Sequence, residues 1–283
     1  MKKSVLSIFL ALFCIQNAFA GQGDTLRVLA IGNSFSQDAV EQHLREIAEA
    51  QGKVIYIGNM YIGGCSLSRH WWNVLRNAHD YRLGYIGDDG KLQYQKDFSI
   101  EQVLRKFKWD VISFQQNSGH SGIEMTYEPY LTKLLEYVRN HTRPGVRFMF
   151  HQTWAYEQTS THQDFVFYHY KQSEMYEAIM KCSRKVCEKH RLEVIPCGTA
   201  IQNLRKSFIG DRVTRDGYHL NTGFGRYTAA ATWFAVLFAE TVSGNSYCPE
   251  GLTREQLEAA QNAADAAVAE PYSSREKEPL LHK

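Results

Sequence analysis

Short apolar runs that favour β-strands alternate with longer amphipathic runs that favour helices along most of the 283-residue chain. Strands are expected at residues 26–31, 53–58, 109–115, 146–152 and 192–197. Helices are expected at residues 39–52, 67–78, 99–107, 127–141, 166–190, 224–242 and 253–270. This alternation is typical of a parallel sheet with helices on both faces. The sequence therefore predicts an α/β fold, a three-layer α/β/α sandwich around a five-stranded parallel sheet.

Two segments depart from the regular alternation. The turn Asp88-Asp89-Gly90 lies between alternating residues at 85–95, which indicates a hairpin excursion. Residues 224–242 are apolar on nearly all sides, so we expect this helix to pack deep in the core.

The first twenty residues have the pattern of a secretory signal peptide. Lys2 and Lys3 precede the apolar run SVLSIFLALFCI, and Ala18-Phe19-Ala20 gives a small-residue cleavage pattern. We therefore expect a signal peptide at residues 1–20, one hydrolase-type α/β/α domain at 21–272 and a ragged tail at 273–283. No lipid or membrane anchor is expected, so the mature protein should be secreted, either periplasmic or extracellular.

Charge and cysteine spacing exclude several partners. The formal net charge is +2 and falls to zero without Lys2 and Lys3, which leaves no electrostatic footprint for nucleic acid. The five cysteines after residue 20 are Cys65, Cys182, Cys187, Cys197 and Cys248. Their number is odd and their spacing fits neither a disulfide scaffold nor a zinc site. No metal and no cofactor is expected, and the oligomeric state is left open.

Polar or glycine-rich residues follow the predicted strands. In open parallel sheets, sites lie beyond the carboxyl ends of the strands. The residues there are Gly32-Asn33-Ser34, Asn59 with Gly63-Gly64, Gln115 to Ser118, and His151-Gln152. Asp216 and His219 precede the deeply packed helix. We expect these segments to converge on one site.

This set of residue types fits a serine hydrolase. Ser34 would be the nucleophile, His219 the base that activates it, and Asp216 the group that orients the imidazole. Two other interpretations of the Ser34 turn remain open, a helix cap and a cradle for phosphate or nucleotide. The phosphate interpretation leaves Asp216 and His219 without a role.

Attack on an ester creates an oxyanion that needs donors already in place. The N–H groups of Ser34 and Gly64 are the backbone candidates, and the side-chain amide comes from Gln116 or Asn117. The length of the preceding strand slightly favours Gln116.

Four blocks carry a family resemblance: IGNSFS, NMYIGGCSL, WDVISFQQNSG and DGYHLN, in this order. Together they resemble the SGNH (GDSL-like) hydrolase and esterase superfamily, in particular a DUF4886-like branch with a GNSFS opening. The resemblance implies a flavodoxin-like SGNH fold and an acyl-enzyme mechanism. Asn33 stands where the superfamily usually has aspartate, and the usual Gly-x-Asn-Asp third block is absent.

Export and a polar, aromatic cleft favour an O-acetylated or otherwise esterified carbohydrate as the substrate. Candidate substrate contacts are Asn33, His70, Trp71, His151 and Trp154. A lipase-like or thioesterase-like acyl hydrolase is an alternative of the same class. A carbohydrate-binding protein that kept the fold without turnover is an alternative of another class.

Overall fold

The computed structural model describes residues 25–273 of the chain. The expected signal peptide at residues 1–20 and residues 274–283 of the expected tail lie outside the described residues.

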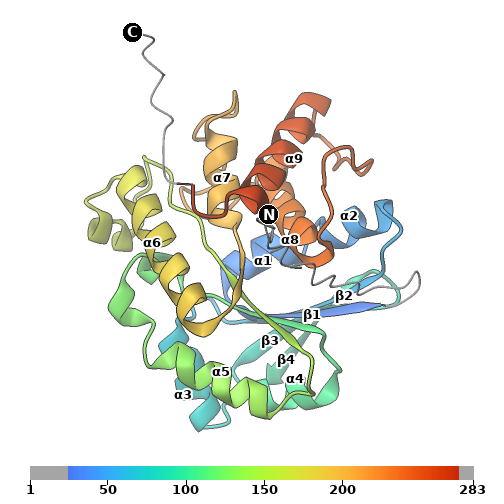
Figure 1. The fold of residues 1–283 in the computed structure, drawn as a ribbon, viewed down its shortest axis with the longest axis vertical. Helices are drawn as coiled ribbons and strands as arrows, with labels where there is room; N and C mark the ends of the chain where they lie inside the picture. The colour runs from blue at the N-terminus through green and yellow to red at the C-terminus, as the bar shows by residue number, and fades with distance from the viewer. Residues whose placement is uncertain (1–24, 274–283) are drawn as a thin grey trace, which may run out of the picture.

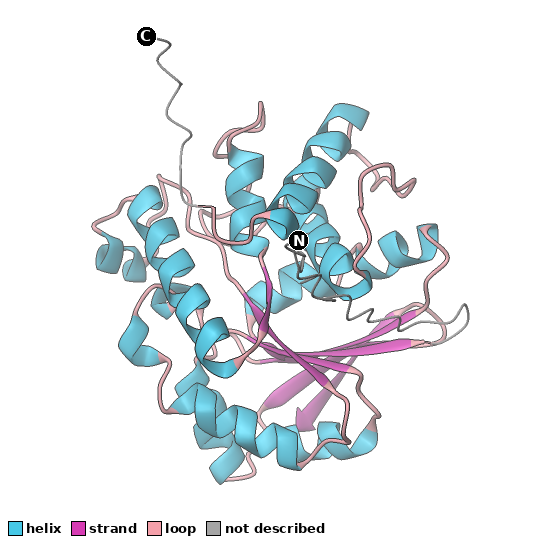
Figure 2. Cartoon of the chain, in the orientation of Figure 1, coloured by secondary structure: helices cyan, strands magenta, loops and turns pink. Residues whose placement is uncertain are grey.

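One sheet of seven strands forms the centre of the described chain (Figure 2). The strands are β1 (Leu26–Gly32), β2 (Ile55–Tyr61), β3 (Tyr81–Ile86), β4 (Leu92–Phe98), β5 (Val111–Phe114), β6 (Arg147–His151) and β7 (Glu193–Ile195). Their order across the sheet is β4-β3-β2-β1-β5-β6-β7. Strands β2, β1, β5, β6 and β7 are parallel to one another, and they match the five strands expected from the sequence.

The predicted strand count is wrong, because the expected hairpin excursion belongs to the sheet. Strand β3 pairs antiparallel with β2, and β4 pairs antiparallel with β3. Alternating residues at 85–95 indicated a hairpin, but they carried no information on which edge it would join.

Nine α-helices and three short 3-10 helices connect and cover the strands within residues 25–273. The α-helices are α1 (Ser34–Val40), α2 (Leu44–Ala50), α3 (Leu67–Leu75), α4 (Ile100–Lys106), α5 (Tyr130–Asn140), α6 (Gln172–His190), α7 (Cys197–Arg205), α8 (Phe224–Phe238) and α9 (Arg254–Ala269). The 3-10 helices are η1 (Ser118–His120), η2 (Glu124–Thr126) and η3 (Gln163–Tyr168). None of these helices combines the length and the apolar character that a membrane span requires.

Two helix predictions need correction. The single helix expected at 39–52 is two helices, because His43 has a positive φ of 69° that breaks the backbone between α1 and α2. Helix α1 also begins earlier, at Ser34, directly after β1. Helix α7 was not expected at all, because its residues directly follow the last strand without a polar linker.

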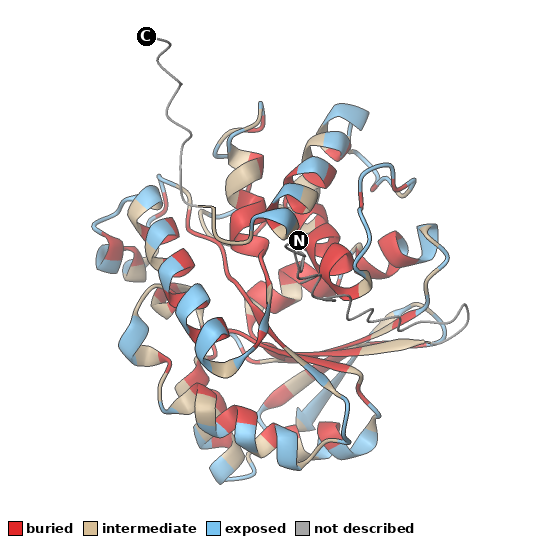
Figure 3. Ribbon diagram, in the orientation of Figure 1, coloured by how far each residue is buried: buried red, intermediate tan, exposed pale blue. Residues whose placement is uncertain are grey.

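The helices form one layer on each face of the sheet (Figure 1). Helices α1, α2, α7, α8 and α9 bury apolar side chains in one core cluster, and α3, α4 and α5 do so in the other. Helix α6 contributes to both clusters. Helix α8 is buried over almost its whole length, as its apolar sequence predicted (Figure 3). The three-layer α/β/α prediction is confirmed.

The strand order reverses beside β1. Strand β1 lies between β2 and β5, so the chain leaves it toward one side and later returns on the other. This is the flavodoxin-like order, and ligands bind at such a switch point, beyond the carboxyl ends of the strands. The segments after β1, β2 and β5 meet there.

Leu29→Ala tests how strongly the fold depends on β1. Leu29 is fully buried, so the substitution should lower the free energy of unfolding by about 2–5 kcal/mol. Leu75→Ala is the matched control, because Leu75 is 54% exposed and its truncation should change the stability by about 0.5 kcal/mol or less. Urea unfolding measures both, and an equal effect of the two variants would contradict the described core.

Candidate active site

The end of β1 places Ser34 at this switch point of the sheet. A side chain at Gly32 would put its Cβ 2.5 Å from Ser36 Oγ and 2.8 Å from the Gln115 carboxamide carbon, so only glycine fits. The Asn33 side chain caps α1 by accepting a hydrogen bond from Phe35 N at 3.0 Å. Ser34 therefore opens the helix, and it is partly exposed. Within residues 25–273 its hydroxyl makes no hydrogen bond.

A chain of side-chain hydrogen bonds runs across the ends of the parallel strands. Asn33 Nδ2 donates to Cys65 O at 3.0 Å, and Gln115 Nε2 donates to Asn33 Oδ1 at 2.7 Å. Gln115 Oε1 and His151 Nδ1 are 2.8 Å apart, and the imidazole is the donor because Oε1 can only accept. These bonds connect the segments after β2, β1 and β5 with the end of β6. Asn33 is 1% exposed, so the prediction that it contacts substrate is wrong.

Asp216 and His219 form a hydrogen-bonded pair in the loop before α8. Asp216 Oδ2 lies 2.7 Å from His219 Nδ1, and Oδ1 accepts from His219 N at 2.8 Å and Tyr218 N at 3.2 Å. Burial raises the pKa of Asp216, but the bonds from the His219 side chain and from these two amides outweigh burial and lower the pKa below its ordinary value. The carboxylate is therefore ionised at neutral pH. His219 is 17% exposed, and its Nε2 has no partner among the described residues.

Asp38 joins this loop to α1. Its carboxylate accepts from Leu220 N at 2.8 Å and pairs with Arg226 at 2.6 Å and Arg215 at 3.2 Å. Burial raises the pKa of Asp38, and the two guanidinium groups offset that effect only in part. Because Asp38 is one helical turn after Ser34, its bond to the residue after His219 brings the two candidates to the same place.

Trp154 makes a second connection between Ser34 and His219. Its ring stacks on Phe35 with the centroids 4.1 Å apart, and its Nε1 donates to Tyr218 O at 2.8 Å. The Phe35 ring also lies 6.2 Å from the His219 ring. The neighbours of Ser34 thus contact the neighbours of His219, although no hydrogen bond within 3.5 Å joins Ser34 Oγ to His219 Nε2. Such bonds are often long before substrate binds.

Besides the Ser34 N–H, the three other candidate oxyanion donors differ in the hydrogen bonds that they already make. Gly64 is exposed, has a φ of +60° and has no heavy atom within 4 Å of a hypothetical Cβ. Gln116 Nε2 donates to both Thr126 O and Thr126 Oγ1, at 3.0 and 3.1 Å. Its Oε1 accepts from Leu67 N and Asn117 N. Because Gln116 is fully buried and its amide nitrogen is bonded to Thr126, the preference for it as the donor to substrate is wrong.

Asn117 has the free amide. Its Oδ1 accepts from His120 N at 3.2 Å, while its Nδ2 makes no hydrogen bond in the described part of the chain. The residue is partly exposed. Of the two candidates, only Asn117 can therefore offer an amide hydrogen to a ligand.

Burial contradicts three more of the predicted substrate contacts. His70 is 1% exposed, and its Nδ1 lies 2.8 Å from Tyr81 Oη. Burial lowers the pKa of both His70 and His151 to about 3, so both rings are neutral. His151 and Trp154 are fully buried and lie in the core. These three side chains shape the site from behind.

Trp71 is not brought to the site either. It is partly buried on α3, with Lys133 of α5 5.5 Å from its ring centroid, on the opposite face of the sheet from α1.

Three residues near Ser34 were missed by the sequence analysis. Tyr218 is partly exposed, and its ring centroid lies 4.0 Å from that of His219. Tyr61 is the last residue of β2 and is also partly exposed. Asp38 could have been found, because it follows Ser34 by four residues and therefore shares its helix face.

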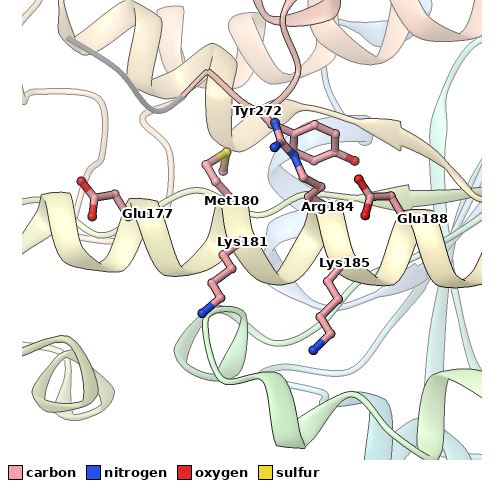
Figure 4. A pocket seen from close by; sticks show the side chains of 7 residues that line it. All are labelled: Glu177, Met180, Lys181, Arg184, Lys185, Glu188 and Tyr272. Carbon is pink, nitrogen blue, oxygen red and sulfur yellow. The ribbon is translucent and has the colours of Figure 1, made fainter.

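Other features of the surface are separate from this site. A cavity of about 580 Å³ lies along α6, where Arg184 is 4.9 Å from the centroid of the Tyr272 ring (Figure 4). It includes none of the candidate residues. Residues 25–273 hold no cluster of three metal-ligating side chains, and all five cysteines in that range are free thiols.

The fold is similar to that of SGNH hydrolases. A proposed SGNH hydrolase from Slackia heliotrinireducens superposes with a TM-score of 0.52 at 18% identity, covering 76% of this chain and 100% of that chain. A proposed GDSL-like lipase from Parabacteroides merdae gives a TM-score of 0.50 at 16% identity, with coverage of 76% and 96%. At these identities the likeness establishes the fold.

The chain belongs to the family described as Domain of unknown function (DUF4886), which matches residues 27–267. The crystal structure of a DUF4886 family protein from Bacteroides uniformis has 46% identity and a TM-score of 0.87, and the match covers 90% of this chain and 98% of that chain. No curated protein sequence matches at a significant level. The family resemblance carried by the four sequence blocks is confirmed.

Asp38→Asn tests the connection between α1 and the His219 loop. Loss of the carboxylate leaves Arg226 and Arg215 without their buried partner, so the free energy of unfolding should fall by about 3 kcal/mol. Amide exchange should also become faster at residues 215–220 than elsewhere. Asp88→Asn is the control, because Asp88 is exposed. If the two variants are equally stable, Asp38 does not hold the loop.

Proposed function

We propose that the protein is a secreted serine esterase that hydrolyses carboxylic esters through an acyl-enzyme. The observation that carries the proposal is the 2.7 Å bond between Asp216 Oδ2 and His219 Nδ1, in a loop joined to the helix that Ser34 begins. This arrangement supports a nucleophile, a base and an orienting carboxylate in the order that acyl transfer needs. The fold, which is that of SGNH hydrolases, supports the same class.

The proton transfers follow from the tautomer of His219. Because Asp216 is ionised and accepts from Nδ1, the proton of neutral His219 lies on Nδ1 and Nε2 is the basic nitrogen. Nε2 takes the Ser34 hydroxyl proton as Oγ attacks the ester carbonyl. The same proton then goes to the leaving alcohol, and a water molecule repeats the sequence to release the acid. Asp216 keeps its negative charge throughout and stabilises the imidazolium.

Three donors would stabilise the negative charge on the carbonyl oxygen. They are the N–H groups of Ser34 and Gly64 and the Nδ2–H of Asn117, one from each of the segments after β1, β2 and β5. Gln116 has a structural role here, because its Oε1 bonds Leu67 N and Asn117 N and so joins the two loops that carry Gly64 and Asn117. The donors are thereby preorganised, which is the condition for a large effect on rate.

The proposed substrate is an O-acetylated or otherwise esterified carbohydrate. Two partly exposed tyrosines, Tyr61 and Tyr218, support this choice, because a phenol ring provides both an apolar face and a polar edge for a sugar. The signal-peptide pattern of residues 1–20 supports a place of action outside the cytoplasm, where such glycans are found.

A fluorophosphonate probe tests the nucleophile. The mature protein should form one adduct on Ser34, located by mass spectrometry, and should hydrolyse p-nitrophenyl acetate. Ser34→Ala should lose both, whereas Ser243→Ala, at an exposed serine before α9, should keep both. Absence of labelling and of turnover between about pH 6 and 9 would exclude the proposed esterase function.

Asn117→Ala tests the side-chain donor. Removal of one oxyanion donor should lower kcat by about 10²- to 10³-fold with a smaller change in KM. Asn140→Ala, at an exposed asparagine on α5, is the matched control and should leave both constants unchanged. An unchanged kcat in Asn117→Ala would remove Asn117 from the oxyanion hole, whereas the role of Ser34 would stand.

A further inference from the structure

Arg82 occupies an unusual place beside the candidate active site. It lies on β3, and its guanidinium carbon is 4.1 Å from the Tyr61 ring centroid and 4.2 Å from the Tyr94 ring centroid. In the sheet Arg82 pairs with Tyr61, and Tyr61 pairs with Gly32. Neighbouring strands are about 4.8 Å apart, so the Arg82 backbone is about 10 Å from the end of β1. That is within the length of a sugar unit plus an arginine side chain.

The hydrogen-bonding capacity of Arg82 is mostly unused. Its one hydrogen bond within the described chain joins Nη2 to Glu41 Oε1 at 3.4 Å. Glu41 has closer partners, Asn59 Nδ2 at 2.8 Å and Tyr94 Oη at 2.7 Å. Arg82 Nε is buried without a hydrogen-bond partner, and Nη1 donates no hydrogen bond to residues 25–273. The side chain as a whole is 25% exposed, so part of it faces solvent.

The polar face of α1 places Arg82 relative to Ser34. Ser34, Gln37 and Glu41 are spaced i, i+3 and i+7, so they lie along one face of the helix. Glu41 contacts Arg82, and Asp38 accepts a hydrogen bond from Leu220 of the His219 loop. Arg82 and the His219 loop therefore both contact the segment that begins with Ser34, within two helical turns of it.

We propose that Arg82 is a specificity-determining residue that binds a carboxylate on the ester substrate, so the preferred substrate is an ester of an acidic sugar or of a dicarboxylic acid. This inference rests on the proposed esterase function. The Tyr61 and Tyr94 rings pack over the guanidinium, with their centroids 4.1 and 4.2 Å from its carbon, so the edge of the guanidinium is where a ligand would bind. A planar carboxylate fits that edge with two parallel hydrogen bonds. Glu41 holds the guanidinium in place from its other side.

The test compares matched charged and neutral esters. In one arm, O-acetylated methyl glucuronoside is compared with O-acetylated methyl glucoside, which places the carboxylate on the alcohol. In the other arm, p-nitrophenyl hydrogen glutarate is compared with p-nitrophenyl butyrate, which places it on the acyl group. In at least one arm the ratio of kcat/KM for the charged over the neutral ester should favour the charged ester and should fall about tenfold or more in Arg82→Gln. The arm that responds identifies which part of the substrate carries the carboxylate.

Two further variants make the result specific. Arg82→Lys keeps the charge without the fork of donors, so it should recover part of the lost preference. Arg254→Gln removes an arginine whose side chain is 90% exposed on α9 and should leave every ratio unchanged. If Arg82→Gln does not fold, the salt dependence of the wild-type kinetics is measured instead, because dissolved ions screen the attraction between the Arg82 guanidinium and a substrate carboxylate. Salt should raise KM for the charged ester alone.

The outcomes separate this inference from the proposed function. Turnover of all esters without a preference for charge, or a preference that Arg82→Gln leaves intact, overturns the role of Arg82 and leaves the esterase standing. Absence of turnover together with absence of Ser34 labelling overturns the proposed function itself.

Discussion

The carboxamide of Asn33 is the contact on which the rest of the site depends. It accepts from Phe35 N and Gln115 Nε2 and donates to Cys65 O, all between 2.7 and 3.0 Å. The side chain therefore starts α1, fixes the segment after β5 and holds the loop after β2. An ionised aspartate has no hydrogen to donate to the Cys65 carbonyl. The contact with the Cys65 carbonyl therefore requires a side chain that can donate, which asparagine provides at this position.

Helix α1 connects these contacts with the more distant parts of the chain. Asp38 of α1 and Glu41, its C-cap residue, are buried carboxylates that pair with arginines of other elements, Asp38 with Arg215 and Arg226, and Glu41 with Arg82. Removing one partner from such a pair is costly, because the other charge is left without compensation. The pairs therefore fix the loop before α8 and the hairpin strand β3 relative to Ser34.

The sequence was sufficient where the relevant contact is local. The five parallel strands, the buried helix α8 and the Asp216–His219 pair each depend on periodicity or on a spacing of a few residues. The sequence was insufficient where the role of a side chain depends on a partner that is distant in the chain. Gln116 and Asn117 are neighbours of similar chemistry, and only the position of Thr126 shows that the Gln116 amide is occupied. In the same way, the residue types of His151 and Trp154 suggested contact with substrate, but the stacking of Trp154 on Phe35 and the bond of His151 to Gln115 turn both inward.

Arg82 shows which residues the sequence pattern does not indicate. The pattern points to residues that follow the parallel strands, and it gives no sign that residues of the antiparallel strand β3 pair with the end of β2. Arg82 lies two strands from Gly32, because β3 pairs with β2, although it is 50 positions away in the chain. It shares the Glu41 carboxylate with Asn59 and Tyr94 and donates only one hydrogen bond to it. The proposed recognition of a substrate carboxylate depends on the donors that this sharing leaves free.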